Sequence, residues 1–117
     1  MGIPPEATFA SIACRLTILA TDVVAADALD ALEPKLAIRI VQASDGVARA
    51  RSGCANGRPK QARTGLARAV RKLVQIETLL RSPKARGASD ATRAALVAES
   101  SGIRSSMTTL RQQGCAP

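Results

Sequence analysis

Apolar residues recur at intervals of three and four positions in four separate segments of the chain, and polar residues fill the positions between them. This spacing matches the period of an α-helix, so each segment is predicted to form a helix with one buried face. The four apolar stripes are Phe9, Ile12, Leu16, Leu19, Val23 and Ala26; Leu36, Ile40, Ala43, Val47 and Ala50; Ala62, Leu66, Ala69, Leu73, Ile76 and Leu80; and Leu96, Ile103, Met107 and Leu110.

Capping signals mark the limits of the first two predicted helices. Thr8 can cap the start of the first helix, which we expect to end near Leu29. Pro34 suits the first turn of the second helix, where a missing N–H group costs no hydrogen bond. The second helix is predicted to end at Ser52-Gly53, because a glycine after the last periodic residue is a C-cap signal.

Glycine and proline also delimit the last two helices. The Asn-Gly pair at 56–57 predicts a turn, and Pro59 lies in the first turn of the third helix. The loop at 81–89 interrupts the periodic pattern, and its last residue, Ser89, can cap the fourth helix. Gly102 lies inside that helix, where glycine costs about 1 kcal/mol relative to alanine. We therefore expect Gly102 to mark a close contact between helices.

Short connections make neighbouring helices antiparallel, so residues 1–117 are predicted to form one all-α domain, an up-down-up-down four-helix bundle. The composition agrees with this fold. Of the 117 residues 46% are hydrophobic, but Phe9 is the single aromatic residue, and Trp, Tyr and His are absent. Alanine, leucine and valine therefore carry the burial, and small side chains let helices approach each other closely.

The three cysteines are predicted to meet at one pole of this bundle. Cys14 lies early in the first helix, while Cys54 and Cys115 each follow the end of a helix. A disulfide would clamp that pole, as is common in small secreted domains; the alternative is three reduced thiols. We expect Cys14 to be bridged to Cys54 or Cys115. The other pairing, Cys54 with Cys115, would leave Cys14 on an outer surface for an intermolecular bond.

Charge is distributed unevenly along the chain, whose net charge is +8. Residues 1–33 carry one basic and five acidic residues, whereas residues 46–72 carry eight basic residues and no acid. Such a basic field attracts polyanions such as nucleic acid or an anionic glycan, although a solvated helix face has the same composition. The candidate polyanion-binding residues on the face of the second and third helices are Arg58, Lys60, Arg63, Arg68, Arg71 and Lys72.

Few residues suited to catalysis are present. Without histidine, a cysteine or serine nucleophile has no imidazole as a partner base. Asp27 and Asp30 could pair as acid and base one helical turn apart, but they are more simply counter-charges for the basic helices. The cysteines lack the spacing of a metal site. We therefore predict no enzyme, no cofactor, no metal site and no small-molecule substrate.

The chain shows no membrane or targeting segment. The apolar run from Leu16 to Ala26 is too short to span a bilayer, and Asp22 interrupts it. The start of the chain has neither the charged region nor the apolar core of a signal peptide. We expect that the signal peptide lies outside this sequence and that the domain is the C-terminal module of a larger extracellular or cell-surface protein.

Two segments resemble a known kind of domain. The stretches CANGRPKQARTGLARAVRKL (54–73) and RGASDATRAALVAESSGI (86–103) are similar to small helical domains appended to secreted bacterial hydrolases and surface proteins. The stretches FASIACRL and GCAP, near the two ends, resemble repeat-like C-terminal regions of extracellular bacterial proteins. The position of Cys54, before the turn, departs from the first pattern. The residues that match the glycine turn and the following helix are Gly57, Ala62, Leu66, Val70 and Leu73.

This resemblance implies a non-enzymatic accessory module for attachment, spacing or self-assembly at the cell surface, and it carries over no binding residues. Our first expectation is accordingly a protein-interaction or self-associating module. The alternative is a polyanion-binding module that uses the basic face of the second and third helices.

Overall fold

The computed structural model describes residues 7–26, 29 and 31–115, and four α-helices make up most of them. The helices are α1 (Phe9–Ala25), α2 (Leu32–Ala55), α3 (Pro59–Arg81) and α4 (Asp90–Gln113), with a short 3-10 turn, η1 (Pro83–Ala85), between α3 and α4. No strand occurs among the described residues. The predicted all-α class and the number of helices are confirmed.

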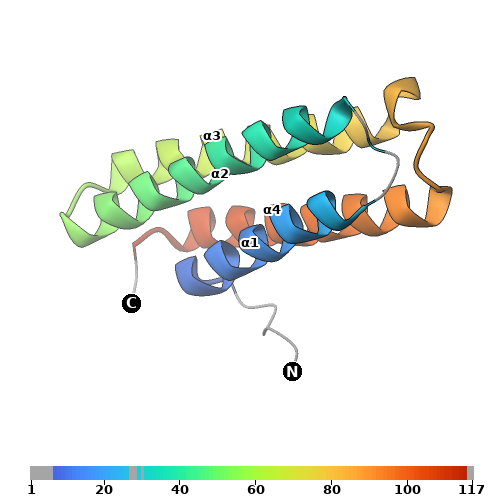
Figure 1. Ribbon diagram of the computed structural model, residues 1–117. Coiled ribbons are helices and arrows are strands. Elements are labelled where there is room, and N and C mark those ends of the chain that lie inside the picture. Colours follow the sequence, from blue (N-terminus) through green and yellow to red (C-terminus); the bar gives the residue numbers. More distant parts are fainter. Residues whose placement is uncertain (1–6, 27–28, 30, 116–117) are drawn as a thin grey trace.

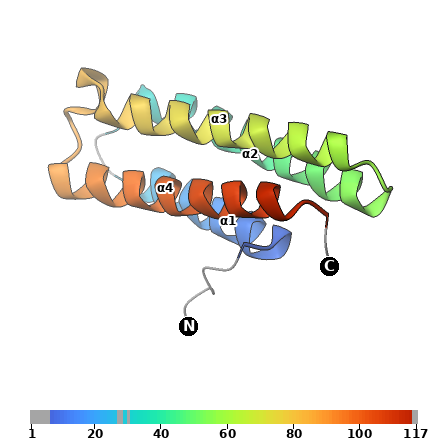
Figure 2. The same ribbon diagram turned by 180° about the vertical axis from the view of Figure 1, so that it is seen from behind.

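The helices form a bundle in which each one packs on two others. α1 contacts α2 and α4, and α3 contacts the same two helices from the other side. Successive helices run in opposite directions along the long axis, as the colour gradient in Figure 1 shows. In both Figure 1 and Figure 2 the turn between α2 and α3 projects beyond the ends of α1 and α4. The α2–α3 hairpin therefore exposes its tip to solvent on several sides.

Local capping explains where the helices begin. The hydroxyl oxygen of Thr8 accepts a hydrogen bond from the Ser11 N–H (3.1 Å), and that of Ser89 accepts one from the Thr92 N–H (3.1 Å). Both caps satisfy backbone donors that have no partner inside the helix. Gly57 adopts a φ of +68°, a conformation that glycine reaches without strain, so the predicted turn at 56–57 is confirmed.

Two predicted helix ends are wrong. α1 stops at Ala25 rather than near Leu29, and Leu29 is buried instead in the connection to α2. α2 continues through Gly53 to Ala55, so Gly53 is not a C-cap. Glycine is instead required at position 53 by packing, because a Cβ atom there would lie 2.9 Å from the backbone nitrogen of Ala62 on α3.

The four apolar stripes form the core, as predicted. Every stripe residue of the last three helices is buried, and in α1 only Phe9 and Ala26, at the two ends of the stripe, are partly exposed. Burial of such side chains stabilises the fold by roughly 1.5–3 kcal/mol for each large aliphatic residue. The core is therefore continuous from one pole to the other, with α1 and α4 covering one side of the α2–α3 hairpin.

The closest helix contact lies between α2 and α3 and is made by glycines. Gly46 and Gly65 face each other, and a Cβ atom at Gly65 would lie 2.5 Å from the Gly46 carbonyl oxygen and 2.9 Å from the Ala50 nitrogen. No side chain fits there, so the two backbones touch directly. Gly102, which we expected to mark such a contact, has no atom within 4 Å of a Cβ built on it. That prediction is wrong, because Gly102 lies on an exposed face of α4.

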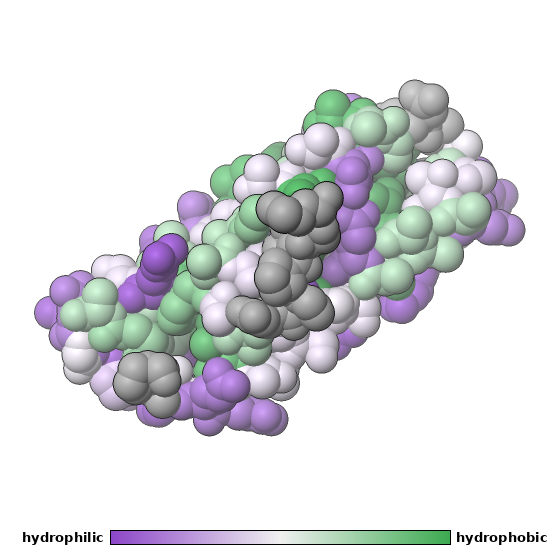
Figure 3. All heavy atoms as spheres, turned by 90° about the horizontal axis from the view of Figure 1, so that it is seen from below, coloured by the Kyte–Doolittle hydropathy of each residue, from purple (hydrophilic) through white to green (hydrophobic). Residues whose placement is uncertain are grey.

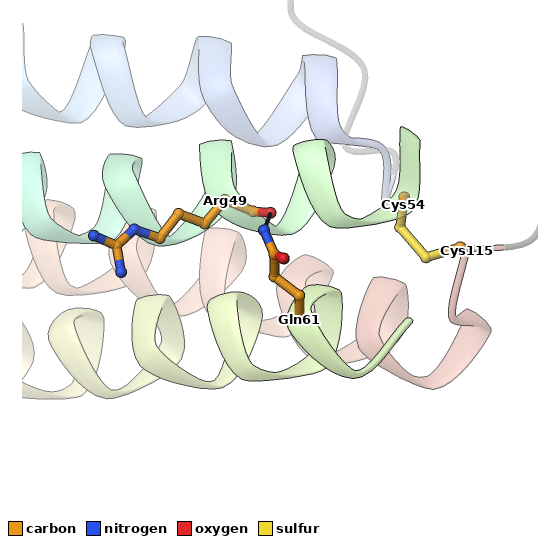
Figure 4. Close-up of a disulfide and its surroundings, with 4 residues drawn as sticks. All are labelled: Arg49, Cys54, Gln61 and Cys115. Carbon is orange, nitrogen blue, oxygen red and sulfur yellow. Dashed lines mark hydrogen bonds between the residues drawn. A yellow bond between two sulfur atoms is a disulfide. The ribbon is translucent and has the colours of Figure 1, made fainter. Parts of the chain in front are cut away.

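A disulfide joins Cys54 at the end of α2 to Cys115 after α4, with 5.2 Å between the two Cα atoms (Figure 4). The predicted clamp at this pole is confirmed, but the expected involvement of Cys14 is wrong. Cys14 is a free thiol on the exposed side of α1, whereas Cys54, in the last turn of α2 rather than after it, meets Cys115 just past the end of α4. The alternative pairing is therefore the correct one. A disulfide of this kind indicates an oxidising, non-cytoplasmic environment.

Replacing Gly65 by alanine should destabilise the bundle. The new methyl group must separate α2 from α3, and overpacking of this kind costs about 1–3 kcal/mol. Gly102→Ala is the matched control, since its methyl group meets no neighbour and should stabilise α4 by up to about 1 kcal/mol. Urea denaturation measures both changes. Equal effects of the two substitutions would contradict the close contact.

Removing the disulfide should also weaken the fold. Cys54 and Cys115 are separated by 61 residues, a loop for which the chain-entropy treatment gives about 4 kcal/mol. We expect the Cys54→Ser/Cys115→Ser variant to lose free energy of unfolding on that scale. The control is Cys14→Ser, which should change little. A loss of stability in Cys14→Ser as large as that in the double variant would show that Cys14 is in the bridge.

Candidate functional site

Basic side chains gather on the α2–α3 hairpin. The predicted residues on α3 and its cap are exposed, apart from Lys72, which is half-buried. The structure adds arginines from two other helices, Arg39 and Arg49 on α2 and Arg111 on α4, because the fold brings them next to α3. We call the whole set the basic surface. Its members are Arg39, Arg49, Arg58, Lys60, Arg63, Arg68, Arg71, Lys72 and Arg111.

The larger hollow in this surface is the α2–α3 groove, with a volume of about 850 Å³. Arg49 lines it from α2, while Arg58, Lys60, Arg63 and Arg68 line it from the α3 side. Gly65, at the direct contact between the α2 and α3 backbones, also borders the groove. Cations from two helices therefore face one depression, and none of the described residues that line it is acidic.

A hydrogen bond fixes one side of this groove relative to the other. The Gln61 side-chain amide of α3 donates to the backbone carbonyl oxygen of Arg49 on α2, with 3.4 Å between nitrogen and oxygen (Figure 4). The contact lies between the disulfide and the glycine pair along the hairpin. It ties the first turn of α3 to the part of α2 that carries Arg49.

A second hollow, the α3–α4 groove, flanks α3 on its other side and has a volume of about 540 Å³. Lys60 and Arg63 border both grooves, and Arg71 with Arg111 of α4 completes the second one. The basic surface thus continues around the first half of α3. Arg111 belongs to it because α4 runs antiparallel to α3 and ends at the disulfide pole (Figure 2).

No carboxylate in the described part of the chain forms an ion pair with the basic surface. Among the described residues the ion pairs are Arg81 with Glu77, Arg93 with Asp90 and Arg104 with Glu77, none of which includes a member of it. The pKa of the Lys72 ammonium group is lowered, first by partial burial and then by the positive charges of Arg39, Arg68 and Arg71. Unpaired cations held close together repel each other, so an added polyanion would be bound favourably.

The six basic residues predicted from the sequence differ in which groove they border. Arg58, Lys60, Arg63 and Arg68 all border the α2–α3 groove, whereas Arg71 belongs to the α3–α4 groove. Lys72 borders neither of the two grooves and lies within the field of Arg39, Arg68 and Arg71. Sequence reasoning missed Arg49 as a site residue, although it lies in the acid-free stretch 46–72. It could not place Arg111, which is distant in sequence.

Glu77 forms a buried charged network that sequence reasoning also missed. Its carboxylate accepts hydrogen bonds from Arg104 Nε (2.9 Å), Arg104 Nη2 (3.1 Å) and the Ser100 hydroxyl (3.1 Å). The hydrogen bond that Arg104 donates to Glu77 in turn raises the pKa of its guanidinium group. Every oxygen of this carboxylate is occupied by α4, so the network joins α3 to α4 and offers no free acid or base.

The remaining acid–base and metal candidates add no site among the described residues. Asp27 and Asp30, the predicted carboxylate pair, lie outside the described residues. Within the described part of the chain no group of three or more cysteine, aspartate or glutamate side chains could hold a metal ion. In the same part of the chain, none of the helices is both long enough and apolar enough to cross a membrane.

The fold and surface define the chain as a disulfide-bonded helical bundle with an unpaired basic hairpin. Comparison with known proteins adds no relative: no protein-family model matches, and searches of curated proteins and of solved structures return no significant match. The predicted resemblance to accessory domains therefore stays a prediction.

A carboxyl pair between α1 and α4 should make the stability depend on pH. Partial burial, then a hydrogen bond and the charge of Asp22, raise the pKa of Glu99 from 4.5 to about 7. The folded state therefore binds more protons than the unfolded state between these values, so the free energy of unfolding should fall as pH rises through this window. Because Glu99 is partly exposed, we expect a loss on the order of 1 kcal/mol.

The variant Glu99→Gln should flatten this pH profile between pH 5 and 8, because the amide cannot lose a proton. Asp45→Asn is the control, since Asp45 is exposed on α2 and forms no ion pair among the described residues. Urea titrations at several pH values measure the effect. An unchanged profile in Glu99→Gln would contradict the assignment.

Proposed function

We propose that this chain is a non-enzymatic module that binds polyanions through the basic surface of the α2–α3 hairpin. The observation that carries the proposal is the set of nine cations around α3, none of which pairs with a carboxylate among the described residues. A protein gains no stability from crowding such charges without counter-ions, since like charges repel. A ligand with many negative groups offsets that repulsion at many points together.

The location of the surface supports this function. The α2–α3 turn projects beyond the ends of α1 and α4, so a long polymer can approach the start of α3 from beyond that end of the bundle (Figure 1). The disulfide indicates an oxidising environment, and we propose that the module works outside the cell or at its surface, where the polyanion would be an extracellular one.

Attachment or self-assembly through protein contacts, our first expectation from the sequence, has less support. The large exposed apolar side chains are spread over three helices: Ile18 and Val24 on α1, Ile38 and Val41 on α2, and Val74 on α3. On the face shown in Figure 3, hydrophobic areas are broken up by hydrophilic and intermediate residues. Extended apolar patches are what usually mark a protein–protein interface. The basic surface is therefore the stronger basis for a function.

The salt needed to elute the protein from heparin and from immobilised DNA tests this function. We expect the unaltered protein to be retained at low salt. The Arg58→Gln/Arg63→Gln/Arg71→Gln variant should elute at a distinctly lower salt concentration, because it makes fewer phosphate or sulfate contacts and its binding therefore releases fewer counter-ions. The control, Arg51→Gln/Arg81→Gln/Arg86→Gln, loses the same charge outside both grooves and should elute close to the unaltered protein.

Absence of retention on either matrix at low salt would contradict polyanion binding. If the protein then also forms oligomers whose size depends on concentration, self-assembly becomes the better function.

A further inference from the structure

The α2–α3 groove presents cations on both of its sides. Arg49 comes from α2, and the remaining cations come from α3 and its cap; Gly65, where the two helices touch, also borders the groove. Arg58 and Arg68 are ten positions apart, so the α3 cations extend over about 15 Å of helix axis. That length suits several successive charged groups of one extended chain, each within reach of an arginine on one side or the other.

The groove lacks what single-stranded nucleic acids need. Proteins that bind single strands stack bases on aromatic side chains. The single aromatic residue of the chain, Phe9, is half-buried on α1 and packs against the core. The basic surface offers a base no aromatic partner and only guanidinium planes to stack on, so a ligand without bases gives up little there relative to a nucleic acid.

The packing of α3 also disfavours a DNA duplex. The major groove of B-DNA is about 12 Å wide and admits one helix. α3 would bring α2 with it along one side, because its backbone touches that of α2 at Gly65 and Gly46. Two helices, each about 10 Å across with side chains, are too wide together. The α2–α3 groove is moreover a depression, and a duplex is a convex cylinder that would contact only its rim.

Arginine dominates the groove and favours oxyanions. Four of its five cations are arginines, and a guanidinium donates two parallel hydrogen bonds to a carboxylate or a similar anionic group. Acidic polysaccharides carry such groups at regular intervals on a single extended chain, and they are abundant in the oxidising environment that the disulfide indicates.

We propose that the α2–α3 groove binds one extended chain of an acidic polysaccharide through carboxylate or sulfate groups. This inference rests on the proposed polyanion-binding function and narrows its ligand. The polysaccharide lies along α3 with Arg49 on one side and Arg58 and Arg68 on the other. Its sugar rings themselves need no aromatic partner.

The test is a set of titrations of the oxidised full chain at one fixed ionic strength. The probes are a heparin oligosaccharide, an oligogalacturonate, a DNA single strand and a DNA duplex, all of similar total charge. We expect one of the two saccharides to bind with a dissociation constant at least about tenfold below that of either DNA. Comparison of the two saccharides separates sulfate from carboxylate recognition.

Two variants locate the binding site. Arg49→Gln/Arg58→Gln/Arg68→Gln should weaken saccharide binding by about tenfold or more, whereas Arg51→Gln/Arg81→Gln/Arg86→Gln, with the same loss of charge, should change it less than about threefold. A third variant, Arg49→Lys/Arg58→Lys/Arg68→Lys, keeps the charge and removes the paired hydrogen bonds. It should lose affinity while the salt dependence stays the same.

Each contrary result has a different meaning. Tighter or equal binding of the duplex or the single strand would overturn the polysaccharide assignment and leave polyanion binding intact. Equal losses in the groove variant and its charge-matched control would overturn the placement in the α2–α3 groove. If none of the four probes binds at low salt, the proposed function itself fails.

Discussion

The direct backbone contact between α2 and α3 is the constraint on which the rest of the structure depends. Gly46 and Gly65 leave no room for a side chain between the two helices, and Gly53 repeats the arrangement nearer the turn. Dispersion and burial at this seam hold two long antiparallel helices together as one hairpin. The same contact sets Arg49 beside the first half of α3, so the α2–α3 groove exists because the helices approach this closely.

The remaining two helices are fixed to this hairpin by different interactions. α1 contributes an apolar stripe, while α4 is held at two points, by the Arg104–Glu77 ion pair along its length and by the Cys54–Cys115 disulfide at its end. A buried ion pair gives little net stability, but breaking one partner away is costly, which favours a single alignment of α3 with α4. That alignment places Arg111 beside Arg71 in the α3–α4 groove.

The four helices and their buried faces could be predicted from the periodic apolar residues, because each stripe depends only on neighbours in the same segment. Glycine could not be interpreted in this way. Gly53 and Gly102 have similar local settings, yet one touches α3 and the other faces solvent. Which two of the three cysteines pair also depends on contacts between helices. The same is true of the burial of Glu77 beneath an arginine 27 residues away. The basic stretch was visible in the sequence; its grooves were not.

The surface that we assign to polyanion binding therefore depends on helix separation as well as on charge. The most direct measurement of this dependence is the affinity of the Gly65→Ala variant for a heparin oligosaccharide, at a temperature where circular dichroism shows the variant to be folded. No cation is removed, but α2 must move away from α3. We predict binding several-fold weaker than that of Gly102→Ala, which should match the unaltered protein. Equal affinities of the two folded variants would contradict the claim that the close contact between α2 and α3 builds the site.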